Sequence, residues 1–299
     1  MTSLMYHIPV LLQASVEGLN LSPDAVVVDV TLGGGGHTRA ILEHLGPNGR
    51  LLAFDQDPDA HHNAPADARF ALITSNFRHL QARLHAEGIA QVDAILADLG
   101  VSSHQLDEPT RGFSYRADAP LDMRMDTTTG PTAADLLNTL SAEEIAHILW
   151  LYGEFHNSRR MAAACVASRP LHTTTQLVAA MRPFLPKVND YPILSRIFQA
   201  LRIAVNDEMG ALEDLLNQSL AMLAPGGRLA IISYHSLEDR LVKHFLQTGN
   251  LEGTLHKDFY GNPQTPWQLI TRKAIQATEA EILDNPRARS ARLRIAQKL

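Results

Sequence analysis

Short apolar runs, separated by turns and helical patterns, occupy the first hundred residues of this chain. Amphipathic patterns at 39–45 and about 77–87 have the 3.6-residue period of helices, and four apolar runs have the length of buried strands. These predicted strands span residues 25–30, 50–54, 70–74 and 92–97. Strands that alternate with helices at this spacing predict a parallel, doubly wound α/β sheet.

The alternation stops after the fourth predicted strand. Residues 102–131 show little periodicity and many turn residues, and a long connection of this kind is usually functional or marks a boundary. Helical patterns follow at 159–167 and 173–181, and the pairs Ser141/Glu144 and Thr173/Gln176 have the spacing of capping boxes. We therefore predict a helical insertion within an α/β domain, with the three parts 1–131, 132–192 and 193–299.

The sheet pattern returns in the last third of the chain. Apolar positions at helical spacing predict one long helix over 193–223, and the run at 228–232 predicts a fifth strand. Ser236 and Asp239 have capping-box spacing ahead of a helix to about Leu246. The last two apolar runs alternate as strands do, which predicts a terminal antiparallel hairpin formed by residues 267–270 and 291–295.

Composition places the chain among ordinary soluble globular proteins, because 45% of its 299 residues are hydrophobic and 19% are charged. Its single cysteine, Cys165, excludes a disulfide framework and a cysteine-ligated zinc site, which fits the reducing cytoplasm. No apolar run approaches the roughly 20 residues that span a membrane. Residues 1–7 contain no basic segment ahead of an apolar one, so we expect no signal peptide.

The net charge of −6 argues against a protein that coats nucleic acid nonspecifically, but it permits a local basic face. The C-terminal tail is one candidate, and a solvated edge strand with outward arginines is the alternative interpretation. Its five basic residues are Arg287, Arg289, Arg292, Arg294 and Lys298.

The transition from the first predicted strand into a helix passes through four glycines, Gly33–Gly36. Glycines let the backbone approach a ligand closely, and the start of a helix offers unpaired N–H groups. A dinucleotide fingerprint requires a third glycine or alanine where this chain has Thr38, so that motif is incomplete. The pattern therefore predicts a nucleoside site without fixing its ligand.

Residues at the ends of the other strands narrow the choice of ligand. Asp55 lies 20 residues after Gly35, where an acid usually binds ribose hydroxyls; a solvated strand-end acid or a helix cap is the alternative. Phe77 is placed to cover an adenine, unless it is a core residue. There is no Gly-Lys-Ser/Thr phosphate cradle. A nucleoside with an uncharged or cationic tail, such as S-adenosylmethionine, fits best, with its carboxylate on the N–H groups of the Gly35–His37 turn.

Eight blocks in order along the chain resemble one family, the bacterial small-subunit ribosomal RNA (cytosine-N4)-methyltransferases of the H type. The resemblance spans residues 7–295, and eight ordered blocks are far more specific than a glycine turn. The blocks are Asp29–His37 (Asp-x-Thr-x-Gly-x-Gly-Gly-His), Asp98–Asp107, Arg111–Ser114, Pro120–Asp126, Phe198–Ile203, Ala224–Leu229, His235–Arg240 and Asn285–Ser290.

The resemblance implies a Rossmann-like S-adenosylmethionine-dependent methyltransferase with a helical insertion. It implies that the enzyme methylates a cytidine in the decoding region, on small-subunit RNA already assembled with protein. The single cysteine and the lack of a long apolar run, given above, add the expectations of a cytoplasmic protein and of no membrane partner. The cofactor-binding residues that the resemblance implies are Gly35, Gly36, His37, Asp55, Phe77, Asp98 and Gln105. The chain departs from the family at Leu32, where phenylalanine is common, at 153–156, and in the short segment 247–266.

Asp98 is the candidate catalytic residue. The lone pair of a cytosine amine is delocalised into the ring, so acceptors that favour a pyramidal nitrogen accelerate its methylation. Asp98 and the carbonyls of Leu99 and Gly100 stand at the right strand end to accept these N–H groups; the alternative is that Asp98 touches only the cofactor. Tyr234 or Phe113 is a candidate stacking face for a flipped base.

Histidine chemistry and two other protein classes remain as alternatives. His235 is either a general base or a packed or capping residue at a helix start, and His61-His62 is a surface pair, so no metal site is expected. The rival classes are a nicotinamide-dependent oxidoreductase with an irregular glycine turn and a non-catalytic RNA-binding assembly factor. The oligomeric state stays open.

Overall fold

The computed structural model describes residues 9–299, so the expectation for residues 1–7 lies outside the described part. The chain forms two compact units. The first contains the chain up to Gly100 and again from Gly210 to the C-terminus, and the second is Val101–Met209. The second unit thus covers a longer stretch of sequence than the insertion predicted at 132–192. That this insertion is a domain of its own stays a prediction.

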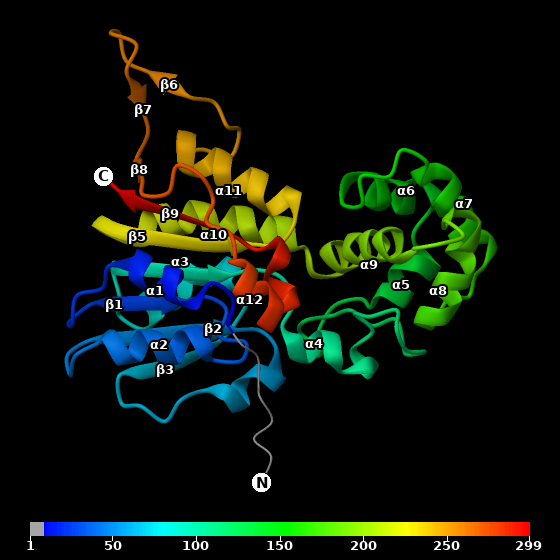
Figure 1. The fold of residues 1–299 in the computed structure, drawn as a ribbon, viewed down its shortest axis with the longest axis horizontal. Coiled ribbons are helices and arrows are strands. Elements are labelled where there is room, and N and C mark those ends of the chain that lie inside the picture. Colours follow the sequence, from blue (N-terminus) through cyan, green and yellow to red (C-terminus); the bar gives the residue numbers. More distant parts are fainter. Residues whose placement is uncertain (1–8) are drawn as a thin grey trace. The chain divides into compact units, whose positions relative to one another are not determined.

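The first unit is built on a seven-stranded sheet, which Figure 1 shows with β3 lowest and β8 near the top. β1 to β5 are mutually parallel, whereas β9 is antiparallel to both β5 and β8. This confirms the predicted parallel sheet with a terminal antiparallel pair. In spatial order the strands are β3 (Phe70–Thr74), β2 (Arg50–Asp55), β1 (Val26–Asp29), β4 (Val92–Asp98), β5 (Leu223–Ser233), β9 (Arg292–Lys298) and β8 (Trp267–Leu269).

Helices cover both faces of this sheet. α1 (Leu12–Leu19) and α2 (Gly36–His44) share one hydrophobic cluster with alternate residues of β5 and β9, such as Ile232 and Leu293. Because side chains alternate along a strand, Arg294 and Lys298 of β9 point to the other face. There Arg294 binds Asp239 of α11 (Ser236–Thr248), and Lys298 donates to main-chain carbonyls at the end of α10 (Glu208–Met222).

The tail is therefore not a solvated edge strand, which corrects one of the two interpretations above. β9 lies between β5 and β8, and the Lys298 ammonium donates to Leu220 O at 2.8 Å and Leu223 O at 2.7 Å. Arg294 is mostly buried against Asp239. At least two of the five basic residues thus hold the fold together.

The long helix predicted over 193–223 is two helices, α9 (Tyr191–Asn206) and α10. They are separated by Asp207, whose φ of 47° is left-handed and ends α9. The periodicity of apolar residues continues across this break, so a single left-handed residue left no signal in the pattern. Across the break, Arg202 forms a bidentate ion pair with Glu208 at 2.8 and 2.9 Å.

The second unit is helical. The capping boxes at Ser141/Glu144 and Thr173/Gln176 form as predicted. The segment 102–131, predicted to be irregular, in fact includes a short helix that Ser102 caps. The helices of this unit ahead of α9 are α4 (Ser103–Asp107), α5 (Ala133–Thr139), α6 (Ala142–Leu151), α7 (Ser158–Ala167) and α8 (Thr174–Met181).

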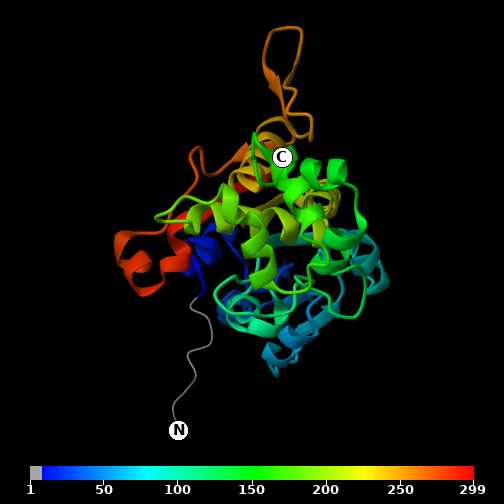
Figure 2. The ribbon, with the colours of Figure 1, turned by 90° about the vertical axis from the view of Figure 1, so that its right-hand side faces the viewer.

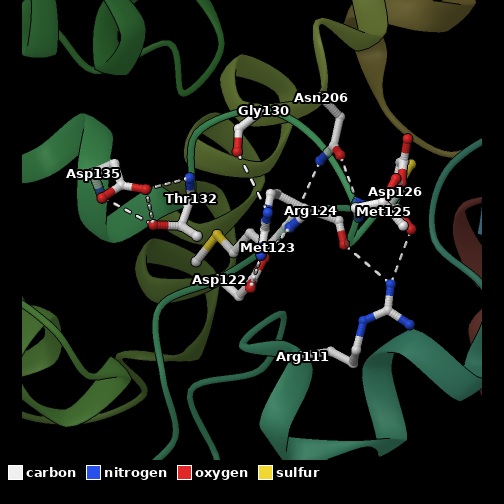
Figure 3. A network of polar contacts seen from close by, with 11 residues as sticks. Arg111, Asp122, Met123, Arg124, Met125, Asp126, Gly130, Thr132, Asp135 and Asn206 are labelled. Carbon is white, nitrogen blue, oxygen red and sulfur yellow. Dashed lines mark hydrogen bonds and ion pairs between the residues drawn. The ribbon is translucent and has the colours of Figure 1, made fainter.

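The remainder of the irregular segment is ordered by polar contacts (Figure 3). The Arg111 guanidinium donates to the carbonyls of Arg124 and Met125, each at 3.0 Å. Asp122 forms an ion pair with Arg124 at 2.8 Å, and Asn206 of α9 accepts from Met125 N and donates to Met123 O. Two of the family-like blocks, 111–114 and 120–126, therefore supply structural contacts within the second unit.

Candidate active site

The glycine turn lies at the carboxyl end of β1, the edge of a parallel sheet where ligands bind. Gly33 and Gly35 have φ of +48° and +70°, a conformation that favours glycine. A Cβ on Gly35 would also lie 2.9 Å from the carbonyl oxygen of Asn63. Gly35 is the N-cap of α2 and no side chain among residues 9–299 caps this helix, so its first N–H groups face the turn without a side-chain acceptor from the described part of the chain.

Neighbouring side chains fix the shape of the turn. Asp55, the last residue of β2, accepts from Gly33 N through Oδ2 and from Asp57 N through Oδ1, both at 2.9 Å. Asn63 donates to Gly33 O at 2.8 Å and Arg39 donates to Gly34 O at 2.6 Å. An ionised carboxylate has about four acceptor positions, so Asp55 can hold the turn and still accept two hydroxyls.

Burial raises the pKa of the Asp55 carboxyl to about 6, although the N–H groups of Asp57 and Gly33 act in the opposite direction. A carboxyl group with this pKa is mostly ionised at pH 7 and mostly protonated at pH 5. Asp55 thus has the position, the acceptor capacity and the charge at neutral pH that a ribose diol requires.

Asp98, the last residue of β4, is held from two sides. The Tyr234 hydroxyl donates to Asp98 Oδ1 at 2.7 Å, and Asp98 N donates to the Thr31 hydroxyl at 2.7 Å. Burial and the adjacent Asp98 carboxylate raise the pKa of Tyr234 above its ordinary value, so this phenol remains a donor. Tyr234, predicted only as a candidate stacking face for the base, thus contacts Asp98 through its hydroxyl, and no local sequence signal indicated this contact.

The His37 side chain is turned into the protein. It is 5% exposed, and its Nε2 lies 3.1 Å from Val10 O, so only the backbone of His37 belongs to the turn. Burial lowers the pKa of His37, which favours a neutral ring that donates from Nε2 to Val10. Its Nδ1 lies 3.8 Å from Asp98 Oδ2, and with a neutral ring this contact is not an ion pair.

Asp29, a buried aspartate beneath the turn, was not among the predicted cofactor-binding residues. Asp29, the last residue of β1, is 1% exposed and accepts from the Thr38 hydroxyl at 2.7 Å and from Thr31 N at 3.1 Å. Burial raises its pKa, against the opposing effects of His37 and these hydrogen bonds. Thr38, the residue that breaks the dinucleotide fingerprint, thus ties α2 to β1.

The remaining predicted residues differ in their surroundings. Phe77 follows β3 and opens a 3₁₀ turn (Phe77–His79) with its side chain half-buried. Gln105 belongs to the second unit, is buried, and accepts from Ser102 N at 3.0 Å in the capping box of α4. Phe113 is 6% exposed inside the core of that unit, so its suggested role as a stacking face is wrong.

The structure also shows the surroundings of the histidines that were considered for catalysis or metal binding. His235 is the N-cap of α11 and forms a capping box with Glu238, which favours the capping interpretation and corrects the box predicted at Ser236/Asp239. His62 is exposed, as a surface pair requires, whereas His61 is only half exposed. The buried Nε2 of His61 has no hydrogen-bond partner within residues 9–299.

The residues present fit S-adenosylmethionine better than a dinucleotide. An uncapped helix start suits a carboxylate, and Asp55 retains acceptor capacity for a ribose. A dinucleotide-binding sheet continues with a sixth parallel strand, whereas here the antiparallel β9 follows β5. Fold and site together define a Rossmann-like, S-adenosylmethionine-dependent methyltransferase.

Comparison with known proteins gives the same class. A model of the MraW methylase family matches residues 4–299, and the chain belongs to this family. It is 51% identical over 298 residues to "Ribosomal RNA small subunit methyltransferase H" of Parabacteroides distasonis, covering 98% of both chains. The protein of the same name from Bacteroides thetaiotaomicron is 52% identical, covering 99% of this chain and 98% of the relative.

Among solved structures, one described as an rRNA methylase from Streptococcus thermophilus is 15% identical, covers 98% of this chain and 99% of its own, and has a TM-score of 0.43. The family assignment rests on the full-length relatives and the family model. Within residues 9–299, none of the helices combines the length and the apolar character needed to cross a membrane.

Proposed function

We propose that this enzyme transfers a methyl group from S-adenosylmethionine to the exocyclic N4 of a cytidine in the decoding region of 16S ribosomal RNA. The observation that carries the proposal is the 51% identity, over 98% of both chains, to a relative named as a small-subunit ribosomal RNA methyltransferase. The Asp98–Tyr234 pair at the carboxyl edge of the sheet supports it, because methylation of an amine needs an oriented acceptor.

The proposed cofactor site uses the glycine turn and the two strand ends beside it. The N–H groups of Gly35, Gly36 and His37 bind the carboxylate, and Asp55 accepts the ribose hydroxyls. Phe77 covers the adenine. The family resemblance adds Gln105 to this set, and it also adds Asp98, for which we expect only a small contribution to cofactor affinity because its carboxylate serves the substrate amine.

S-adenosylmethionine, when bound, supplies an electrophilic methyl group on a sulfonium centre. Asp98 accepts an N–H of the cytosine amine through Oδ2, while Tyr234 holds Oδ1. This hydrogen bond concentrates the lone pair on N4 and fixes its direction, so it strengthens as the nitrogen becomes pyramidal. The bound cofactor would give up this methyl group, its S–C bond breaking as the N–C bond to N4 forms, and the methylated amine would lose one proton to solvent.

We further propose that the substrate is the RNA within an assembled small subunit and that the enzyme acts in the cytoplasm. A labelled methyl group from S-adenosylmethionine is expected to enter the RNA of small subunits isolated from cells that lack the enzyme, and to enter free 16S RNA much more slowly. Absence of label from both RNAs would leave a non-catalytic assembly factor as the better description.

The role of Asp98 is tested by Asp98→Ala, with Asp98→Asn as the variant of matched size. We expect kcat to fall at least 100-fold in Asp98→Ala, while the Kd of S-adenosylhomocysteine changes less than about fivefold. The Asp98→Asn variant keeps one acceptor oxygen, so its kcat is expected to fall less than that of Asp98→Ala. If cofactor binding and turnover fall together, Asp98 serves the cofactor and is not the acceptor for the amine.

A further inference from the structure

The C-terminal part of the first unit is cationic in an acidic protein. From Ser236 to the C-terminus the chain has ten Lys or Arg residues against seven Asp or Glu, whereas the whole chain has a net charge of −6. This part contains α11, β8 and β9, together with a hairpin whose strands are β6 (His256–Lys257) and β7 (Pro263–Gln264). Such an asymmetry is typical of a surface that meets a polyanion.

Three of these cations line one surface pocket. Lys243 of α11, Arg272 of the loop after β8 and Arg294 of β9 surround it, with Thr271 and Gln247 between them. Arg294 shares the carboxylate of Asp239 with Arg292. Lys243 and Arg272 are exposed and have no ion pair or hydrogen bond within residues 9–299. The carboxylate of Asp239 therefore balances only part of the charge of the four cations Lys243, Arg272, Arg292 and Arg294, and positive charge remains in excess.

The hairpin that joins α11 to β8 carries two exposed aromatic rings at its tip. Phe259 is 97% exposed and Tyr260 is 86% exposed, with ring centroids 5.6 Å apart in an edge-to-face arrangement. Figures 1 and 2 show this orange hairpin extending away from the sheet of its own unit. Monomeric proteins seldom leave neighbouring large rings in water without a partner for them.

Hydrogen bonds hold the turn at the tip of the hairpin in one conformation. Asp258 Oδ1 accepts from Tyr260 N at 2.9 Å and from Asn262 N at 2.8 Å, and Oδ2 accepts from the Asn262 side-chain amide at 3.0 Å. Gly261 N donates to Asp258 O at 3.0 Å. These contacts fix the backbone that carries both rings, so a ligand would meet them already ordered.

The hairpin lies at the edge of the sheet opposite the cofactor edge. β8 begins at Trp267 beside Lys298, whereas the carboxyl end of β5, Ser233, lies beside Arg292. The six residue-to-residue steps along β9 from Arg292 to Lys298 span about 20 Å at the usual rise per residue. The rings therefore cannot contact the base that reacts near Asp98, and they need another ligand.

We propose that the pocket of Lys243, Arg272 and Arg294 and the rings of Phe259 and Tyr260 form a second RNA-binding surface, here termed the docking face. It binds an unpaired segment of the substrate RNA, with phosphates at the cations and bases stacked on the rings. The inference rests on the proposed function and extends it to a contact remote from the reacting cytidine. Excess positive charge and exposed aromatic faces on the same unit are the combination that single-stranded nucleic acid requires, since every base presents a stacking face.

A contact at this distance acts on binding and leaves the chemical step unchanged. It stabilises the bound substrate and the transition state equally, so its loss raises KM and leaves kcat at saturating RNA unaltered. Each phosphate contact also contributes about 0.7 to the slope of log Kd against log salt concentration for single strands. Stacking adds no such salt dependence.

The test uses the full chain with small ribosomal subunits from cells that lack the enzyme. Phe259→Ala combined with Tyr260→Ala is expected to raise Kd and KM at least fivefold, with unchanged kcat and unchanged affinity for S-adenosylhomocysteine. Lys243→Ala and Arg272→Ala are each expected to weaken binding and to lower the salt slope by about 0.7. Leu283→Ala, at a residue 81% exposed on α12 (Glu279–Asp284), and Arg50→Ala, at an exposed ion pair, are the controls.

The outcomes separate this inference from the function on which it rests. If the wild-type enzyme methylates the subunits and the docking variants match their controls in Kd and KM, the docking face is wrong while the function stands. The Phe259/Tyr260 double variant could instead keep its affinity for RNA and lose either self-association or binding to a ribosomal protein. In that case the rings bind protein, and the proposal is overturned. If the wild type transfers no methyl group, the function itself fails.

Discussion

The pKa of Asp55 gives a prediction about how cofactor affinity depends on pH. Burial raises that pKa to about 6, and both oxygens of the carboxyl already accept a main-chain N–H. In the proposed site the ionised form accepts two ribose hydroxyls, and protonation removes acceptor capacity. Binding therefore favours the carboxylate and lowers its pKa in the complex, so affinity falls as pH decreases through 6.

The magnitude follows from the linkage between proton and ligand. If the pKa falls to about 4 or lower in the complex, Kd for S-adenosylhomocysteine is about tenfold weaker at pH 5 than at pH 7, or about 1.4 kcal/mol. Above pH 7 the curve is flat. At pH 6 half of the free protein carries the proton, so binding releases about 0.5 proton per ligand. The carboxyl and amino groups of the ligand keep their charges between pH 5 and 7.

Isothermal titration calorimetry between pH 5 and 8, in buffers of different ionisation enthalpy, measures both quantities. Asp55→Asn removes the titrating group and is expected to bind more weakly at pH 7 and to lose the pH dependence. His61→Gln is the control that keeps the Asp55 carboxyl, and it should retain the pH dependence at slightly higher pH, because His61 lowers the pKa of Asp55 and its buried Nε2 has no hydrogen-bond partner within residues 9–299. A flat wild-type curve, or a slope that survives in Asp55→Asn, would refute the assignment.

Three further variants test other parts of the site and fold. Gly35→Ala places a Cβ 2.9 Å from a carbonyl oxygen at positive φ, so the Kd of S-adenosylhomocysteine should rise at least tenfold; Gly88→Ala, at positive φ in open space, should leave it unchanged. Tyr234→Phe removes the donor to the β4 carboxylate and should lower kcat about tenfold without altering cofactor affinity; an unchanged kcat would show that the hydroxyl is dispensable. Asp239→Asn leaves Arg294 poorly paired and should lower the free energy of unfolding by about 3 kcal/mol in urea titrations. Although burial alone would raise the pKa of Asp239, its hydrogen bonds and ion pairs with the arginines lower it. The difference in free energy of unfolding between wild type and Asp239→Asn should therefore be full above pH 4, and it should vanish as pH falls through the lowered pKa of the folded state.

Local patterns predicted most of the first unit. Buried parallel strands are continuous apolar runs bounded by turns, so the bounds of β2 and β3 follow from the sequence to within a residue. Capping boxes are equally local, because the two residues that exchange hydrogen bonds lie only three positions apart. The glycine turn and Asp55 could be paired because parallel strands end at one edge of the sheet.

Errors arose where a single residue or a distant partner decides the outcome. Asp207 breaks a helix without breaking its apolar period. His235 takes the N-cap one residue before the Ser236 that the spacing favoured. Phe113 follows a turn-rich stretch that resembles an exposed loop, yet contacts of Arg111 and Asn206 order that stretch and the ring is buried.

By itself, then, the sequence determined the class of fold, the sheet edge at which the glycine turn and the strand-end acids lie, and the family, because these depend on apolar periodicity and on short motifs with fixed spacing. Only the tertiary structure decided which side chains meet across strands. Tyr234 on Asp98, His37 on Val10 and Lys298 on the end of α10 join residues 27 to 136 positions apart. No local pattern encodes such pairs, since they exist only once the sheet has formed and hydrogen bonds must be satisfied within it.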